Sequence, residues 1–406
     1  MEAGIERKLL VERQKLSALL EITNAVNRNY KVDELMSQFQ DVMHDYIGVK
    51  KLAFINSINK WECILHYGVD DACENFDYNS LLEFKTPTFV SDTSFERLNE
   101  FELILPVYHK EKPLSYLLVG GIGEGEMINF IQNHVGFVQT LANVVSVAIE
   151  TKTLAKEVLK KKLEEKDMEF AAEMQKLLLP DDLPSNQHLN ISATYIAKNM
   201  VSGDYYDFFR LNENEYVFCI ADVSGKGLSA AMLMANFQAT LKANVKYNHE
   251  NLTLVELVSE LNKSIVEAAK GEKFITFFIG YYNESNRILK FINAGHNYPI
   301  LIHQNNFKQL KTGSTALGIF DPLPEIQSVE IEIKPNTIIV CFTDGLVEVE
   351  NSEGEQFQTK RLADSISSYS YLNMSELNKA IIRDVNKFKG ENPYPDDTAI
   401  LSLRII

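Results

Sequence analysis

The sequence has few cysteines and no segment apolar enough to span a membrane. Its four cysteines, Cys63, Cys73, Cys219 and Cys341, are scattered without a Cys-x-x-Cys pair, which argues for reduced thiols and against a disulfide scaffold or zinc site. Residues 1–12 mix acids and bases and lack the apolar core of a signal peptide. No run approaches the roughly 18 apolar residues that a membrane-spanning helix needs. We therefore expect a cytoplasmic protein with no membrane partner.

The chain also lacks an excess of positive charge. It has 40 Lys and Arg against 56 Asp and Glu, a net charge of −16, which disfavours nucleic acid and anionic membranes as partners. Its 406 residues are 45% hydrophobic and 24% charged, as in soluble globular proteins. At about 100–200 residues per domain, this length predicts two or three domains.

Residues 1–150 are predicted to form the first domain, which begins with two helices. Residues 5–30 place Leu9, Leu16, Leu19 and Val26 at heptad-like spacing. This pattern fits either a helix packed on its own domain or a dimer interface, and both interpretations stay open. Asp33 is expected to cap a second helix that runs to about residue 47.

Strands follow these helices, and a longer helix closes the domain. Short apolar runs at 52–55 and 63–67 predict strands, and runs at 101–108 and 114–119 around a polar turn predict a hairpin. An apolar-striped helix is expected over about 127–150. This layout, with the Leu-Pro-Val and Leu-Leu-Val-Gly-Gly strings of the hairpin, resembles a GAF sensory domain.

Residues 151–180 are strongly helix-forming and are expected to continue the closing helix as a signalling linker. Two apolar sets are separated by the charged stretch 160–167, which breaks the heptad pattern and favours loose, switchable pairing over a permanent coiled coil. A solvated interdomain helix is the alternative. The linker has no His to be phosphorylated, which argues against a sensor kinase, and Pro180 and Pro184 end the helix.

Residues 181–406 read as a domain of many strands and few helices. Strands are expected at 191–196, 216–221, 274–281, 289–293, 300–303, 338–342 and 399–404, and helices at 229–245, 254–269 and 374–388. Strands and helices do not alternate as in βαβ units, so we expect an α+β fold.

Four aspartates of this domain lie at the ends of apolar strands. They occur in the strings Gly203-Asp204-Tyr205-Tyr206-Asp207, Ala221-Asp222-Val223-Ser224-Gly225-Lys226-Gly227, Thr343-Asp344-Gly345 and Asp396-Asp397-Thr398. Each string alone could be an ordinary turn. Carboxylates that converge without matching Lys or Arg repel one another unless hard cations neutralise them. The four together therefore predict bound Mg²⁺ or Mn²⁺ and metal-assisted hydrolysis.

These strings occur in an order that resembles a known family. Together with Asn293-Ala294-Gly295-His296-Asn297 and the helical string at 171–180, they resemble the SpoIIE-like branch of the metal-dependent protein phosphatase 2C superfamily over residues 168–406. The resemblance implies an αββα sandwich, in which two β-sheets are flanked by helix layers.

The resemblance also implies a set of metal ligands. Asp204 and Asp222 would bridge two Mn²⁺ or Mg²⁺ ions, the Val223 carbonyl would add a ligand, and Asp344 would bind one ion. Asp396 is the preferred ligand of its pair, with Asp397 as the fallback. These four aspartates, Asp204, Asp222, Asp344 and Asp396, are the candidate catalytic residues. Asp207 should point to the opposite face of its strand and be structural.

Three further residues are weaker candidates for the substrate groove. Lys226 could meet the substrate phosphate or be a solvated lysine, His296 could donate a proton or be structural, and Glu348 lies near the groove. The string around Lys226 lacks the leading glycine and the Ser or Thr of a P-loop, which argues against nucleotide binding. Ser224 stands where the eukaryotic branch has a proposed proton donor, so the general acid is left open.

The function implied is hydrolysis of a phosphoseryl or phosphothreonyl protein by water, without a phosphoenzyme. The usual substrate of the branch is a phosphorylated STAS-domain anti-anti-sigma factor. The N-terminal domain and linker would set activity, in a homodimer formed through the N-terminal and linker helices. The alternative is an inactive pseudophosphatase scaffold that binds a STAS-type partner.

Overall fold

The chain divides into two compact units, residues 1–162 and 163–406, in a computed structural model. The structure describes residues 2–57, 60–69, 77–92, 98–109, 111–122, 127–180, 182–247, 253–304 and 306–406. Within these ranges, no helix is both long enough and apolar enough to cross a bilayer.

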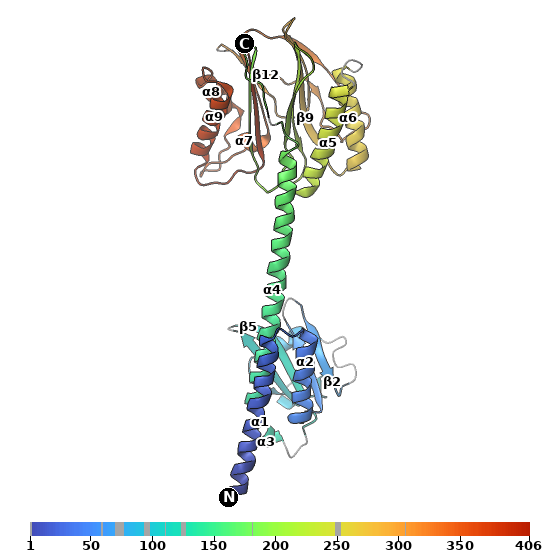
Figure 1. The fold of residues 1–406 in the computed structure, drawn as a ribbon, viewed down its shortest axis with the longest axis vertical. Helices are drawn as coiled ribbons and strands as arrows, with labels where there is room; N and C mark the ends of the chain where they lie inside the picture. The colour runs from blue at the N-terminus through green and yellow to red at the C-terminus, as the bar shows by residue number, and fades with distance from the viewer. Residues whose placement is uncertain are drawn as a thin grey trace. The chain divides into compact units, whose positions relative to one another are not determined.

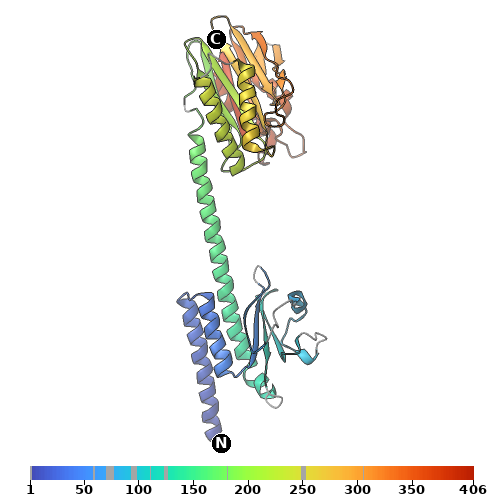
Figure 2. The same ribbon diagram turned by 90° about the vertical axis from the view of Figure 1, so that its right-hand side faces the viewer.

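The first unit is a five-stranded antiparallel sheet with helices on one face (Figure 2). The strand order is β2-β1-β5-β4-β3. Side chains alternate along β1, so that Leu52 and Phe54 pack toward the helices and Ala53 and Ile55 enter a separate apolar cluster on the other face. The elements are α1 (Glu2–Asn27), α2 (Val32–Asp41), a π-helical turn (Val42–Tyr46), β1 (Lys51–Asn56), β2 (Glu62–Tyr67), 3-10 turns (Tyr78–Glu83 and Val90–Asp92), β3 (Thr88–Phe89), β4 (Leu103–His109), β5 (Lys112–Gly120) and α3 (Met127–Asn133).

The predicted hairpin is confirmed, whereas the predicted cap of the second helix is wrong. Strands β4 and β5 pair antiparallel from Leu103 to His109, with a register shift between Val107 and Tyr108. The residue that precedes α2 is Lys31, whose backbone N donates to Glu34 Oε2 at 2.9 Å. Asp33 instead lies in the first turn, where its negative charge suits the helix N-terminus.

The expectation of four reduced thiols is also wrong at one position. Cys63 is disulfide-bonded, whereas Cys219 and Cys341 are buried free thiols. Cys73 lies outside the described residues.

One uninterrupted helix, α4 (Val135–Lys176), runs through the predicted linker. The closing helix of the first unit therefore does continue toward the second unit, and the division of the chain at residue 162 falls inside it. Gln175 is 8% exposed and Leu178 packs against the core of the second unit, but Met174 is 59% exposed. The sequence predicts that Met174, Gln175 and Leu178 belong to one apolar set of the linker, and the structure instead divides them between a buried and an exposed side.

The second unit is a sandwich of two sheets with helices outside both (Figure 1). One sheet has the order β13-β10-β9-β8-β7 with β14 beside β10, and the other has the order β12-β11-β15-β16-β6. Helices α5 and α6 cover the first sheet, and α8 and α9 cover the second. The strands are β6 (Leu189–Ile196), β7 (Tyr205–Arg210), β8 (Glu215–Val223), β9 (Ile275–Asn283), β10 (Ile288–Ala294), β11 (Ile300–His303), β12 (Asn306–Gln309), β13 (Gly313–Ser314), β14 (Val329–Glu332), β15 (Thr337–Phe342) and β16 (Thr398–Ile405), and the helices are α5 (Leu228–Tyr247), α6 (Leu254–Ala269), α7 (Asp344–Val347), α8 (Gln358–Ser368) and α9 (Met374–Lys389).

Strand alternation in β8 decides which face of the sheet carries the Asp222 side chain. Cys219 and Ala221 pack toward α5 and α6, whereas Phe218 and Ile220 pack between the sheets. Asp222 is in phase with Phe218 and Ile220, so it lies on the side that faces the second sheet.

Candidate active site

The four candidate aspartates come together at one end of the sandwich, from both sheets. Asp204 and Asp222 belong to the first sheet, where Tyr205 pairs with Ala221 in neighbouring strands. Asp344 follows β15 and Asp396 precedes β16, and these two strands pair with Phe342 opposite Ile400. Segments almost two hundred residues apart in the chain thus converge at one edge.

Burial and mutual repulsion make these carboxylates hard to ionise. Burial raises the pKa of Asp204 well above its usual value, and the charge of Asp222 raises it further. The pKa of Asp222 is raised by burial, then by Asp344 and Asp396. Burial and the charge of Asp396 raise the pKa of Asp344 in the same way. Asp204, Asp222 and Asp344 therefore hold their protons more tightly than a free carboxyl does, unless a cation balances the charge.

Two glycines allow the backbone approach that brings the carboxylates together. A Cβ on Gly203 would lie 2.8 Å from the carbonyl oxygen of Val223, the proposed backbone ligand. A Cβ on Gly345 would lie 2.0 Å from the carbonyl oxygen of Asp397. Neither contact could be accommodated, so any side chain at these positions would push apart the strand ends that carry the aspartates.

Thr343 holds the two sheets together at this edge, and the sequence motifs did not identify it. Its Oγ1 donates to Asp204 Oδ2 at 2.9 Å and accepts from Ala399 N at 2.8 Å. The hydroxyl thus orients a proposed ligand of the first sheet from the end of a strand in the second. The Thr-Asp-Gly string, in which Thr343 precedes Asp344, is the sequence signal that could have identified it.

Asp396 and Asp397 have different environments. Asp397 is 7% exposed and accepts hydrogen bonds from Lys198 N at 2.8 Å and Gly203 N at 3.3 Å. Its carboxylate is therefore occupied in joining three loops. Asp396 lies where its charge raises the pKa of both Asp344 and Glu348, which fits its choice as the ligand of the pair.

Of the three weaker candidates, two lie at the carboxylate cluster and one is buried. Lys226 and Glu348 lie at the carboxylate cluster: Lys226 Nζ is 2.6 Å from Asp396 Oδ2, and burial followed by Asp344 raises the pKa of Glu348. His296 does not reach the surface, because it is 3% exposed and its Nδ1 lies 2.8 Å from Thr276 Oγ1.

The environment of His296 argues against a proton donor to substrate. Burial lowers its pKa to about 4, and the Phe342 backbone offsets only part of this effect. Its Nε2 has no hydrogen-bond partner of normal geometry among the described residues. The imidazole is therefore neutral at pH 7, and the structural interpretation is the one that fits.

Asp207 lies away from the cluster, as strand alternation predicts. Its Oδ2 accepts from Tyr205 Oη at 2.6 Å and its Oδ1 from Phe208 N at 2.7 Å. Both bonds are on the side of the sheet that α5 covers, where Tyr205 packs.

The end of α4 is bonded directly to the segment that carries Asp204. Gln175 Nε2 donates to the carbonyl of Ser202 at 2.6 Å, and Ser202 N donates to Gln175 Oε1 at 3.0 Å. Ser202 Oγ in turn accepts from Asp204 N at 3.1 Å. A two-point contact thus links the predicted linker helix to a proposed metal ligand.

The donor set suits hard divalent cations. Within the described ranges, no three or more His, Cys, Asp or Glu side chains are gathered tightly enough to chelate an ion alone. The carboxylates are nevertheless close enough to shift one another's pKa. Mg²⁺ binds through one or two carboxylates and keeps several waters, so a site with few carboxylates for each ion fits it, whereas structural Zn²⁺ needs four close N or S ligands.

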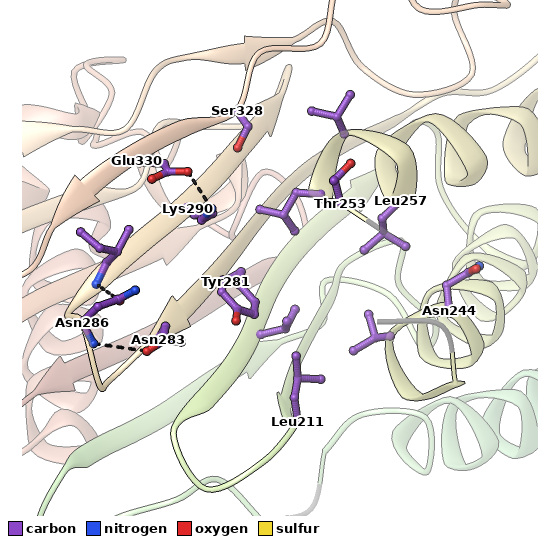
Figure 3. A pocket seen from close by; sticks show the side chains of 15 residues that line it. Leu211, Asn244, Thr253, Leu257, Tyr281, Asn283, Asn286, Lys290, Ser328 and Glu330 are labelled. Carbon is purple, nitrogen blue, oxygen red and sulfur yellow. Dashed lines mark hydrogen bonds and ion pairs between the residues drawn. The ribbon is translucent and has the colours of Figure 1, made fainter. Parts of the chain in front are cut away.

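A cavity of about 520 Å³ lies elsewhere on the same unit (Figure 3). It is lined by residues such as Leu211, Leu257 and Tyr281, with the Lys290–Glu330 ion pair at 2.7 Å on its wall. Val217 lines it near the start of β8, whereas Asp222 is near the end of that strand. The cavity is therefore separate from the carboxylate cluster.

The C-terminal part of the chain is similar to known proteins. Residues 212–406 match the family described as Stage II sporulation protein E (SpoIIE). Protein IcfG of Synechocystis sp. is 27% identical over 244 residues, which cover 54% of this chain and 38% of IcfG. Phosphoserine phosphatase RsbU of Bacillus subtilis is 26% identical over 245 residues, which cover 59% of this chain and 70% of RsbU.

A solved structure shows the same fold. The SiaA-PP2C domain of Pseudomonas aeruginosa superposes with a TM-score of 0.55 at 20% identity, covering 61% of this chain and 99% of that domain. The αββα sandwich expected for the C-terminal unit is thereby confirmed.

Proposed function

We propose that this chain is a metal-dependent protein serine/threonine phosphatase, because residues 212–406 match the SpoIIE family and the second unit has the fold of a PP2C domain. The observation that carries the proposal is the convergence of Asp204, Asp222 and Asp344, whose pKa values are all raised by burial and by neighbouring carboxylates. Such a site is costly unless divalent cations bind there.

The proposed ligands are Asp204, Asp222, Asp344 and Asp396, with the Val223 carbonyl. Two bound Mn²⁺ or Mg²⁺ ions would supply an activated water and neutralise charge on the phosphoryl group. The protein's own residues would set the geometry of this site. Thr343 orients Asp204, and Asp397 positions the loops that carry Lys198 and Gly203. Glu348 lies beside this cluster and is proposed to face the substrate groove.

The proposed substrate is a phosphoserine or phosphothreonine of a regulatory protein, in the first instance a STAS-domain anti-anti-sigma factor. Support comes from the family resemblance and from the similarity to RsbU, which is named a phosphoserine phosphatase. We propose no Cys or Ser nucleophile, so water would attack phosphorus directly.

We also propose that the first unit is a GAF-like sensory domain that acts through α4, in a homodimer. Exposed apolar side chains lie along α4, where a second copy could cover them: Leu154, Val158, Leu159, Leu163, Phe170 and Met174 are each more than half exposed. Leu9 and Leu16 of α1 are also exposed, at 65% and 68%, whereas Leu19 and Val26 pack on their own unit. The packed-helix interpretation of the α1 heptad thus fits Leu19 and Val26, and we propose the dimer interface for Leu9 and Leu16.

Phosphate release from a phosphoserine protein tests the enzymatic proposal. Activity should disappear in excess EDTA and return with Mn²⁺, whereas Zn²⁺ should restore it poorly because the site offers only oxygen ligands. Full activity in EDTA would refute the two-metal site. Tight binding of a STAS-domain partner without any phosphate release would favour the pseudophosphatase scaffold.

The contact between Gln175 and Ser202 offers a test of control by α4. Gln175→Ala removes both hydrogen bonds to the loop before Asp204. Gln238→Ala is a matched control, because Gln238 Nε2 donates to the Leu178 carbonyl at 3.2 Å and anchors the same chain segment without touching Ser202. Gln175→Ala should weaken Mn²⁺-dependent turnover more than Gln238→Ala. Equal effects would show that the contact is only an anchor.

A further inference from the structure

Lys226 forms an ion pair with a carboxylate that we propose as a metal ligand. Its Nζ lies 2.6 Å from Asp396 Oδ2, in a pair whose side chains are 48% and 35% exposed. The same Nζ donates to the carbonyl of Pro395 at 3.3 Å. An ammonium group therefore lies beside the Asp396 carboxylate, and a divalent ion held by Asp396 would share this carboxylate with it.

The backbone around Lys226 leaves this side chain free to move. Lys226 lies in the loop between β8 and α5, and it is flanked by Gly225 and Gly227, whose φ angles are +87° and +75°. A Cβ on Gly227 would meet no atom within 4 Å. The loop is therefore open at Gly227, whereas at Gly225 a Cβ would lie 2.6 Å from Lys273 Nζ. A half-exposed ion pair is weak, so the lysine can leave Asp396 at little cost.

A divalent ion would gain more than the lysine does from the same position. The charge of Asp396 acts on Asp222, Asp344 and Glu348, so these four carboxylates share one electrostatic field. Lys226 makes its ion pair with Asp396. An ion of twice the charge in this shared field is favoured over the tethered ammonium.

Lys198 provides a comparison within the same cluster. Its Nζ also donates to the Pro395 carbonyl, and its backbone N donates to Asp397 Oδ1 at 2.8 Å. Its ammonium group has no ion pair with Asp396 among the described residues. The two lysines thus share a carbonyl acceptor but differ in their relation to the proposed ligand.

We propose that Lys226 is a tethered cation that competes with a divalent metal ion for Asp396, and that metal binding displaces it. This inference rests on the proposed function, because it assumes that Asp396 is a metal ligand. Lys226 would then be a positioning residue that sets the metal concentration at which the site becomes fully loaded.

Displacement can be measured directly on the full chain. Lysine acetylation by an activated ester is followed by mass spectrometry, with and without Mg²⁺. Reactivity of Lys226 should rise severalfold when Mg²⁺ is present, because the ammonium loses its carboxylate partner, and Lys198 should change less. Unchanged reactivity of Lys226 at saturating Mg²⁺ would overturn the proposal.

Metal affinity provides the second measurement. Calorimetric titration with Mn²⁺ should show the weaker of two binding events tightened about two- to fivefold in Lys226→Met, with a smaller change in Lys198→Met. Equal changes in both variants would indicate a general loss of positive charge and would overturn displacement. Wild-type protein that binds no Mn²⁺ would refute the proposed function itself, whereas two bound ions with no effect of Lys226→Met would refute only the lysine's role.

Discussion

Thr343 Oγ1 donates a hydrogen bond to Asp204 Oδ2 at 2.9 Å across the two sheets of the sandwich. The two residues are 139 positions apart in the chain, and both are buried, at 0% and 1% exposure. The same hydroxyl accepts from Ala399 N at 2.8 Å, so its orientation is determined. The bond stabilises the ionised form of Asp204, against a pKa that burial raises.

Replacing Thr343 should therefore weaken metal binding. Thr343→Val keeps the shape of the side chain but removes the donor, and we expect Mn²⁺ affinity or turnover to fall by about 10–100-fold, as for other groups that orient metal ligands. Thr343→Ser keeps the hydroxyl and should retain most of the activity. A Mn²⁺ titration of phosphate release measures this, and wild-type behaviour of Thr343→Val would contradict the role.

Proposed ligands and their neighbours should respond differently to loss of charge. Asp222→Asn and Asp344→Asn should lower turnover by roughly three orders of magnitude while the fold is retained. Asp207→Asn should instead act on stability, because Asp207 is bonded to Tyr205 and Phe208 on the helix-covered side. His296→Ala should lower turnover far less than Asp222→Asn or Asp344→Asn does. Circular dichroism and phosphate release separate the two effects; high activity of metal-loaded Asp222→Asn would mean that the site is misassigned.

The raised pKa values also predict how stability depends on pH. Asp204, Asp222 and Asp344 hold protons more tightly in the folded protein than in the unfolded chain, where a carboxyl pKa is about 3.9. Stability in EDTA should therefore fall as pH rises from about 4 through the raised folded values. Divalent ions should reduce this loss, because they favour the ionised forms.

Thermal unfolding at several pH values, with EDTA or Mg²⁺, checks this expectation. Asp222→Asn is the control: it should be more stable than the wild type in EDTA at pH 8 and gain less from Mg²⁺. A melting temperature in EDTA that does not decline between pH 5 and 8 would contradict the electrostatic account.

If α4 is a rigid linker, basal turnover should depend on the helical phase of the residues inserted in it. Residues inserted after Lys162, within the charged stretch of α4, rotate everything beyond them on the helix. Two or four extra residues should change basal turnover severalfold, whereas seven should nearly preserve it, because seven residues restore the heptad phase. If the fragment from residue 181 onward is monomeric and matches the full chain under all conditions, α4 is only a tether.

Local patterns were sufficient to predict most of the strands and helices. Buried strands such as β15 and β16 are continuous apolar runs, and α6 carries both an apolar stripe and the Thr253–Glu256 capping box. The elements that the sequence does not predict, β3, β12, β13, β14, α7 and α8, are short or lack an apolar run of their own. Their stability comes from contacts with neighbouring segments, which local sequence does not record.

The sequence by itself was sufficient to propose the chemistry of the site, because four aspartate strings at strand ends together favour binding of hard cations. It also determined that Asp204 and Asp207 face opposite sides, since strand alternation is a local property of the backbone. Only the tertiary structure decided that Asp397 joins loops while Asp396 pairs with Lys226, that His296 is buried, and that Gln175 and Met174 point in different directions. These outcomes depend on which distant segments pack together, and adjacent residues with the same local pattern meet different neighbours in the folded chain.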